Sequence, residues 1–331
     1  MPDRPHVVCL TPVRNEARFL PNFLAAAETW ADAIIVLDQR STDGSREIVS
    51  AHPKVVLVDN PNPEYNQGTR QRLLWQRARE EFPGPRVVFG LDADEALTAD
   101  ATSSREWEAV LDAPPGTPIL MQWLNLLPDG TAWIPIAPKR FALVDDGSAP
   151  DTSLHPRYKV HAGSRPPLVL DDIGMLHLQH LDWNHMKSKQ RWYQAWRHVQ
   201  MPELRPRDLY REFHWMDVMS PDQIIPVETR WLAGYSASGI ELTPVEPAPD
   251  PSWQDLEVID LIRRHGPATF RRIDLWDHDW TAAAHEAGCE VPEDPRSRFD
   301  RWVVRYLAAT QRWRYRLPQR AIERALETTG W

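Results

Sequence analysis

The chain has 331 residues, a formal net charge of −9 and only two cysteines, Cys9 and Cys289. The negative charge argues against nonspecific binding to nucleic acids, and two cysteines exclude a disulfide framework. No apolar run approaches the roughly 20 residues that a membrane span needs. No signal peptide is visible before the first apolar segment, so we expect a cytoplasmic protein.

The N-terminal part alternates between short apolar runs and helical patterns. Strands are predicted at His6–Leu10, Ala33–Leu37, Lys54–Val58 and Arg86–Leu91, and helices at 19–27, 46–51 and 67–80. Buried parallel strands are continuously apolar, whereas amphipathic helices repeat apolar residues every three or four positions. The alternation predicts an α/β fold with a doubly wound, mostly parallel sheet flanked by helices. Such sheets bind ligands beyond the carboxyl ends of their strands.

Polar motifs follow three of the predicted strands. These are Thr11-Pro12-Val13-Arg14-Asn15-Glu16, then Asp38-Gln39-Arg40-Ser41-Thr42-Asp43-Gly44, and then Asp92-Ala93-Asp94-Glu95. Three carboxylates within four positions repel one another, and a hard divalent cation such as Mg²⁺ or Mn²⁺ would hold them together. In strand geometry Asp92 and Asp94 would point to the same face. The alternative is a solvated turn.

In their order and spacing, the three motifs resemble the family 2 glycosyltransferases with the GT-A fold. The resemblance covers residues 6–100 and becomes weaker up to residue 185. It implies an inverting enzyme that depends on a nucleotide sugar and on Mn²⁺ or Mg²⁺. We expect a UDP sugar as donor, and as acceptor a hydroxyl group of a polysaccharide, a glycolipid or a secondary metabolite.

The resemblance also implies roles for individual residues. Nucleotide-sugar binding falls to Thr11, Pro12, Asn15, Glu16, Asp38, Gln39, Arg72 and Asp92. Relatives often have a second aspartate where this chain has Gln39; an amide can still contact a nucleobase, but the identity of the base is left open. Asp94, together with Asp92, would bind the metal that bridges the diphosphate. Arg72 would contact a phosphate, or it lies on a solvated helix face.

A histidine late in the domain often completes the metal site in this family. His177 is preferred over His180 for this role, although a histidine among leucines is more often structural. Lys187 and Arg191 belong to a basic cluster that, by the same resemblance, would lie over the diphosphate.

The general base is the weakest part of the resemblance. The candidates are His161, Asp145, Asp146, Asp171 and Asp172, with His161, Asp171 and Asp172 preferred. Some relatives carry a His-Glu pair in this region, but Ala162 follows His161 here. A non-catalytic nucleotide- or carbohydrate-binding protein on the same fold therefore stays open. A nucleotidyltransferase is the other alternative, disfavoured because the segment 11–16 has no glycine for a phosphate-binding loop.

The second half differs in character. We expect residues 1–185 to form the GT-A catalytic domain and residues 186–331 a helical, tryptophan-rich extension that contacts the acceptor, another subunit or a membrane. Most of its tryptophans would fill a core between helices. Arginines from Arg298 to Arg324 alternate with aromatic residues, including Trp302 and Tyr306. This stretch would touch anionic lipid at the inner membrane face or a lipid-diphosphate acceptor, form a charged outer face of a helix pair, or make a dimer contact.

Overall fold

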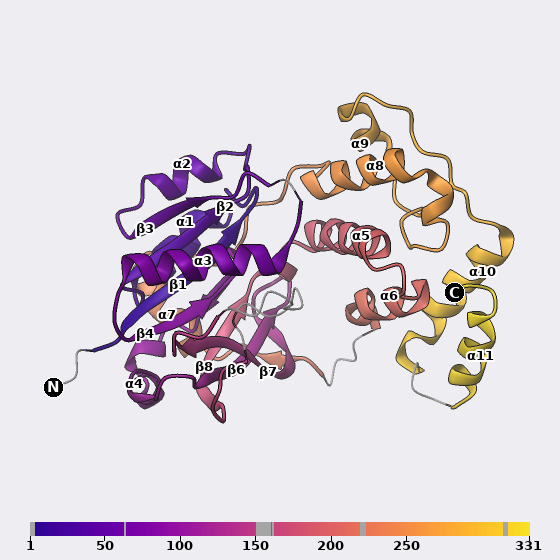
Figure 1. The fold of residues 1–331 in the computed structure, drawn as a ribbon. Helices are drawn as coiled ribbons and strands as arrows, with labels where there is room; N and C mark the ends of the chain where they lie inside the picture. Colours follow the sequence, from indigo (N-terminus) through magenta and orange to yellow (C-terminus); the bar gives the residue numbers. More distant parts are fainter. Residues whose placement is uncertain (1–3, 63, 150–159, 161, 219–222, 314–316) are drawn as a thin grey trace. The chain divides into compact units, whose positions relative to one another are not determined.

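The computed structural model of the chain describes residues 4–62, 64–149, 160, 162–218, 223–313 and 317–331 (Figure 1). The chain forms two compact units, and each is described by itself. The first unit contains Met1–Asp182 and Ile224–Glu246, and the second contains Trp183–Gln223 and Pro247–Trp331. The segment 224–246 therefore returns to the first unit after the second has begun.

The first unit is built on a central sheet. Its strands are β1 (His6–Val13), β2 (Ala33–Asp38), β3 (Val55–Asp59), β4 (Arg86–Gly90), β5 (Glu95–Leu97), β6 (Pro118–Leu126), β7 (Ala132–Val144), β8 (Leu168–His177) and β9 (Ile225–Pro226). Their order is β3-β2-β1-β4-β7-β6-β8-β5, and β9 pairs with β7. The first four strands are parallel, as predicted. Beyond β4 the sheet is mixed, because β7 is antiparallel to both β4 and β6.

Helices cover this sheet. They are α1 (Leu20–Glu28), α2 (Ser45–Ser50), α3 (Gln67–Glu81), α4 (Arg105–Asp112) and α7 (Arg230–Ala237). Because side chains alternate along a strand, Val7 of β1 packs in one core with Leu20 of α1, and Val8 packs in another core with Leu74 of α3. The central strands are therefore buried on both faces, which explains their continuous apolar runs. The α/β fold class is confirmed.

Two local expectations are corrected at the carboxyl edge of the sheet. The loop expected to begin at Thr11 begins later, because β1 continues to Val13. β4 pairs with β1 only as far as Leu10, so the missing N–H of Pro12 leaves no gap in that ladder.

The second correction concerns Asp92 and Asp94, which lie in a turn after β4 rather than in a strand. The backbone N–H of Glu95 donates to the Asp92 carbonyl (3.0 Å), and the Asp92 N–H donates to the Glu95 carboxylate (2.8 Å). Glu95 is buried and closes the turn, which accounts for one of the three clustered carboxylates.

The second unit is helical, as expected. Its helices are α5 (Trp183–Gln200), α6 (Pro206–Phe213), α8 (Trp253–His265), α9 (Thr281–Glu286), α10 (Arg298–Thr310) and α11 (Leu317–Glu327). Capping boxes of Ser252 with Asp255 and of Ser297 with Asp300 start α8 and α10. In the described part of the chain, no helix is both long and apolar enough to cross a bilayer.

Candidate active site

Two loops at the carboxyl edge of the sheet are joined by hydrogen bonds. The backbone N–H of Asn15 donates to Ser41 Oγ (3.0 Å), and the N–H of Thr42 donates to Asn15 Oδ1 (2.8 Å). The N–H of Glu16 donates to Ser45 Oγ (2.9 Å). Asn15 has a φ of 55°, a left-handed conformation that asparagine adopts more readily than most residues. Asn15 thus holds the loops after β1 and β2 in one arrangement.

Asp38 ends β2 beside Asp59 of β3, its partner in the strand register. The Asp38 side chain is buried; its Oδ1 accepts the Ser41 N–H (3.3 Å), and its Oδ2 lies 3.5 Å from Arg46 Nη1. The same guanidinium also pairs with Asp59. Arg46 therefore neutralises two carboxylates that neighbouring strands bring to this edge.

Gln39 is 1% exposed, and both ends of its amide bond to the protein. Its Nε2 donates to the carbonyls of Asn62 (3.0 Å) and Glu64 (2.8 Å). Its Oε1 accepts from Nε of Arg70 (2.6 Å), whose guanidinium also lies over the Tyr65 ring. Gln39 therefore holds Arg70 and the chain near residue 62 in place.

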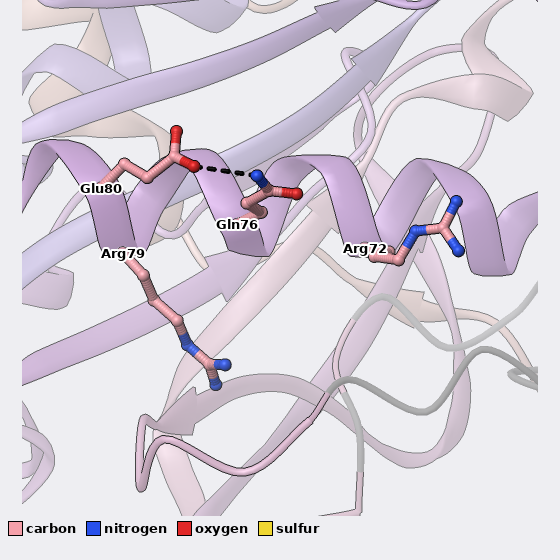
Figure 2. Close-up of a pocket in the computed structure, with 4 residues that line it drawn as sticks. All are labelled: Arg72, Gln76, Arg79 and Glu80. Atoms are coloured by element: carbon pink, nitrogen blue, oxygen red, sulfur yellow. Dashed lines mark hydrogen bonds between the residues drawn. The ribbon is translucent and has the colours of Figure 1, made fainter.

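Arg70, rather than Arg72, is the arginine that α3 brings to the end of β2. The buried face of α3 includes Arg70, Gln71 and Leu74, a spacing that sequence periodicity could have indicated. Arg72 is exposed and lines a pocket of about 300 Å³ with Gln76, Arg79 and Glu80 (Figure 2).

Arg79 in that pocket is committed to Asp145, to which it donates two hydrogen bonds (3.1 and 2.7 Å). Burial would raise the pKa of Asp145, but hydrogen bonds from Arg79 and Arg86 outweigh it and lower the pKa. Asp145 is therefore a carboxylate held in a structural ion pair.

Asp94 and His177 lie together at the carboxyl edge. The backbone N–H of Leu178 donates to the Asp94 carbonyl (2.8 Å), which joins the turn after β4 to the end of β8. His177 Nε2 is 3.8 Å from Asp94 Oδ2, too far for a hydrogen bond. Both side chains are buried. Asp92, in the same turn, is partly exposed.

Asn125 sets the orientation of His177. It lies opposite His177 in the pairing of β6 with β8. Asn125 Nδ2 donates to the Trp123 carbonyl (3.3 Å), so its Oδ1 faces His177 Nδ1 at 2.7 Å. Because an amide oxygen only accepts, the proton lies on Nδ1, and Nε2 faces Asp94. The imidazole also stacks on the Trp123 ring, with centroids 4.6 Å apart.

Asp94 and His177 would suit a metal ion whose remaining ligands come from the substrate. Within the residues described, no group of three or more His, Cys, Asp or Glu side chains could hold a metal by itself. A carboxylate and an imidazole nitrogen nevertheless match Mn²⁺ or Mg²⁺ in sites where substrate phosphates and water supply the other ligands. A histidine whose other nitrogen is hydrogen-bonded is the usual arrangement around a metal ligand.

Two of the base candidates, Asp171 and Asp172, have contacts elsewhere on β8. Asp171 and Asp172 lie earlier on β8, between Val169 and Gly174, where the pairing with β6 shifts register. Their backbone N–H groups donate to the Glu106 carboxylate (2.8 and 3.0 Å). His161 lies outside the described residues.

Lys187 and Arg191 lie on α5 in the second unit. Arg191 Nη2 donates to Asp255 Oδ1 (2.9 Å) and to Ser188 Oγ (2.8 Å), and Asp255 is 2% exposed. Arg191 is thus part of a buried ion pair between α5 and α8. Lys187 is exposed, with Nζ 5.8 Å from the centre of the Trp183 ring.

The mixed sheet flanked by helices gives the first unit a fold of the GT-A type. Residues 8–110 match the family model described as glycosyl transferase family 2. This part of the chain is therefore similar to that family. No curated protein sequence matches the chain.

Parts of the chain are also similar to solved structures. Glucosyl-3-phosphoglycerate synthase from Mycobacterium tuberculosis, in complex with Mn²⁺, UDP and glucosyl-3-phosphoglycerate, is 16% identical, with 37% of this chain and 44% of that chain covered and a TM-score of 0.27. A mycobacterial protein is 16% identical (38% and 42% covered; TM-score 0.28). HddC from Yersinia pseudotuberculosis, complexed with GMP-PN, is 10% identical (55% and 97%; TM-score 0.29). The chain thus spans less than half the length of the first two.

Proposed function

We propose that the chain is a metal-dependent, inverting glycosyltransferase that moves a sugar from a nucleoside diphosphate to an acceptor hydroxyl. The observation that carries this proposal is the pair of Asp94 Oδ2 and His177 Nε2, which lie 3.8 Å apart. Asp94 lies in the turn after β4, within the residues that match the family model. A UDP sugar is the first donor to test.

Asp94 and His177 would hold the divalent cation, with Asp92 beside them in the same turn. When bound, such a cation supplies positive charge that stabilises the departing diphosphate. Asn125 keeps the proton of His177 on Nδ1, which leaves Nε2 able to act as a ligand. Burial of both side chains fixes their geometry before the donor arrives.

For the nucleotide, we assign direct contacts to Glu16, Asp38, Asp92 and Arg70. Gln39 acts through Arg70, because its own amide is occupied on both sides. Asn15 acts by fixing the loop after β1. Thr11 and Pro12 are buried in β1, the strand from which that loop continues.

The proton of the acceptor hydroxyl requires a base in an inverting reaction. His161 stays the prediction for this role.

The experiment is a screen of UDP and GDP sugars for thermal stabilisation, with and without Mn²⁺, followed by an assay for release of nucleoside diphosphate. A ligand that binds only the folded state raises the melting temperature. Stabilisation that needs both the donor and the metal, with release of diphosphate, is the expected result. Stabilisation without turnover, even with cell-extract acceptors, would instead identify a binding protein.

A further inference from the structure

The outward face of α10 carries aromatic side chains that a water-exposed helix rarely shows. Phe299 is 44% exposed and Trp302 is 51% exposed. The two rings stack with centroids 5.9 Å apart, and Trp302 stacks in turn on Tyr306 at 5.7 Å. The opposite face of α10 is already used, because Val303 and Leu307 pack in a core with Tyr210 and Trp331. The aromatic face is therefore not needed to hold the second unit together.

Basic side chains flank these rings. Arg298 and Arg305 are exposed, and no carboxylate among the described residues pairs with either of them. Asp300 points the other way: it is buried, caps the helix and accepts a hydrogen bond from Trp331 Nε1 (3.1 Å).

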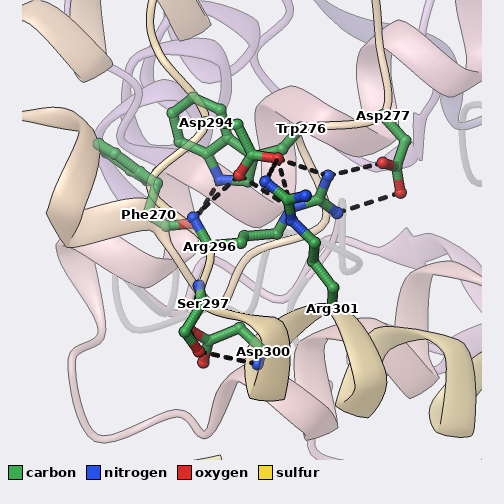
Figure 3. Close-up of polar contacts among 8 residues, drawn as sticks. All are labelled: Phe270, Trp276, Asp277, Asp294, Arg296, Ser297, Asp300 and Arg301. Carbon is green, nitrogen blue, oxygen red and sulfur yellow. Dashed lines mark hydrogen bonds and ion pairs between the residues drawn. The ribbon is translucent and has the colours of Figure 1, made fainter.

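A neighbouring network shows how this unit balances its other charges. Arg296 pairs with Asp277 (2.6 Å) and Asp294 (3.0 Å), and Arg301 pairs with Asp294 (3.2 Å), as Figure 3 shows. Two arginines thus meet two aspartates. Arg298 and Arg305 keep their charge next to the exposed rings.

We propose that this face, formed by Arg298, Phe299, Trp302 and Arg305, binds the surface of an anionic lipid bilayer. Indole and phenyl rings favour the boundary between headgroups and acyl chains, and guanidinium groups bind lipid phosphates. The two rings lie between the two arginines on one face of the helix, so both kinds of side chain reach the same plane.

Other occupants fit this face less well. An isologous contact between two copies would bring Arg298 and Arg305 towards their own equivalents, and like charges repel. A duplex nucleic acid would match the arginines, but its phosphate backbone offers no apolar surface to the exposed rings of Phe299 and Trp302.

The test is co-sedimentation of the full chain with vesicles of phosphatidylcholine alone and of phosphatidylcholine mixed with phosphatidylglycerol. We expect binding to the mixed vesicles that weakens as salt is raised, because exposed charges are screened. Arg305→Gln should weaken it about fivefold, the effect of one arginine near an anionic surface. Trp302→Ala should weaken it on its own, with circular dichroism unchanged because the side chain is exposed.

Arg263→Gln is the matched control. Arg263 is an exposed arginine of α8 that pairs with no described carboxylate, so the variant loses the same charge from another helix. Equal losses for Arg263→Gln and Arg305→Gln would overturn the proposal, as would absence of vesicle binding at low salt. Dimers that become monomers on Trp302→Ala would assign the face to a second copy instead.

Discussion

His177 Nε2 lies 3.8 Å from Asp94 Oδ2, although the two residues come from the end of β8 and from the turn after β4. The hydrogen bond from the backbone N–H of Leu178 to the Asp94 carbonyl holds the two residues close together independently of their side chains. The proposed metal site therefore depends on how β8 aligns with the turn, and the first predictions address it.

Asp94→Asn keeps the size of the side chain and removes its charge. We expect loss of Mn²⁺-dependent stabilisation by the donor, and a fall in turnover of at least about 100-fold, because metal stabilisation of the leaving group contributes several kcal/mol. Calorimetric titration with Mn²⁺ and a diphosphate-release assay measure both effects. The exposed carboxylate of Glu108 on α4 provides the control, since Glu108→Gln should change neither. Normal Mn²⁺ binding by Asp94→Asn would reject the assigned role.

Asn125 offers a test of the histidine orientation that does not depend on turnover. Asn125→Leu removes the acceptor for His177 Nδ1 and should weaken Mn²⁺ binding about 10- to 100-fold. Asn125→Asp retains an acceptor and should stay closer to the wild-type chain. Electron paramagnetic resonance of free Mn²⁺ measures the affinity.

The control for Asn125 is Thr98→Val, which removes another buried side-chain acceptor beside β8, where Thr98 Oγ1 accepts the Gly174 N–H (3.4 Å). If Thr98→Val weakens Mn²⁺ binding as much as Asn125→Leu, the effect is general loosening of β8 rather than orientation of His177. If wild-type protein binds no Mn²⁺, the metal site itself is rejected.

Gln39→Ala should lower the free energy of unfolding by about 3 kcal/mol, because buried Arg70 loses its acceptor and two carbonyls lose their donor. Urea denaturation measures the change. Gln76→Ala removes an exposed glutamine whose amide bonds Glu80 (2.8 Å), and should change stability by less than about 0.5 kcal/mol. Equal effects of the two substitutions would show that the Gln39 contacts contribute little.

His214 predicts a pH dependence in the second unit. Burial lowers the pKa of His214, but the hydrogen bond (2.8 Å) and charge of Asp274 outweigh it, so the folded pKa lies above the ordinary 6.5. The contribution to stability is then full below pH 6.5 and is lost as the pH rises through the folded pKa.

The pKa values of His198 and His278 are lowered mainly by burial, and these histidines contribute with the opposite sign. The measurement is therefore a difference in free energy of unfolding between wild type and His214→Gln, below pH 6 and above pH 8. The difference should be larger at the lower pH. A difference independent of pH would contradict the assigned ion pair.

The two cysteines should differ in reactivity. Burial raises the pKa of the Cys9 thiol to about 12, whereas Cys289 is partly exposed. Iodoacetamide should therefore modify Cys289 in the native protein and both cysteines in urea, as measured by mass spectrometry. Modification of native Cys9 at the rate of Cys289 would show that β1 opens readily.

Much of the first unit could be predicted from the sequence. Strands such as Ala33–Asp38 are buried on both faces, so their apolar runs stand out, and the three polar motifs follow directly from the strand ends. Helices α8 and α10 were also predictable from the spacing of their apolar residues. The hydrogen-bond partners of the polar side chains could not be predicted. The sequence predicts that Gln39 contacts a nucleobase, whereas in the structure its amide bonds to Asn62, Glu64 and Arg70.

What the sequence alone determined is which residues are buried and which motifs end the strands, because periodicity and strand ends are local properties. The tertiary structure decided which polar atoms meet: Asn125 with His177, His177 with Asp94, and Arg191 with Asp255. It also decided that the segment 224–246 returns to the first unit. These partners are distant in sequence and depend on strand register and helix packing, which no local pattern specifies.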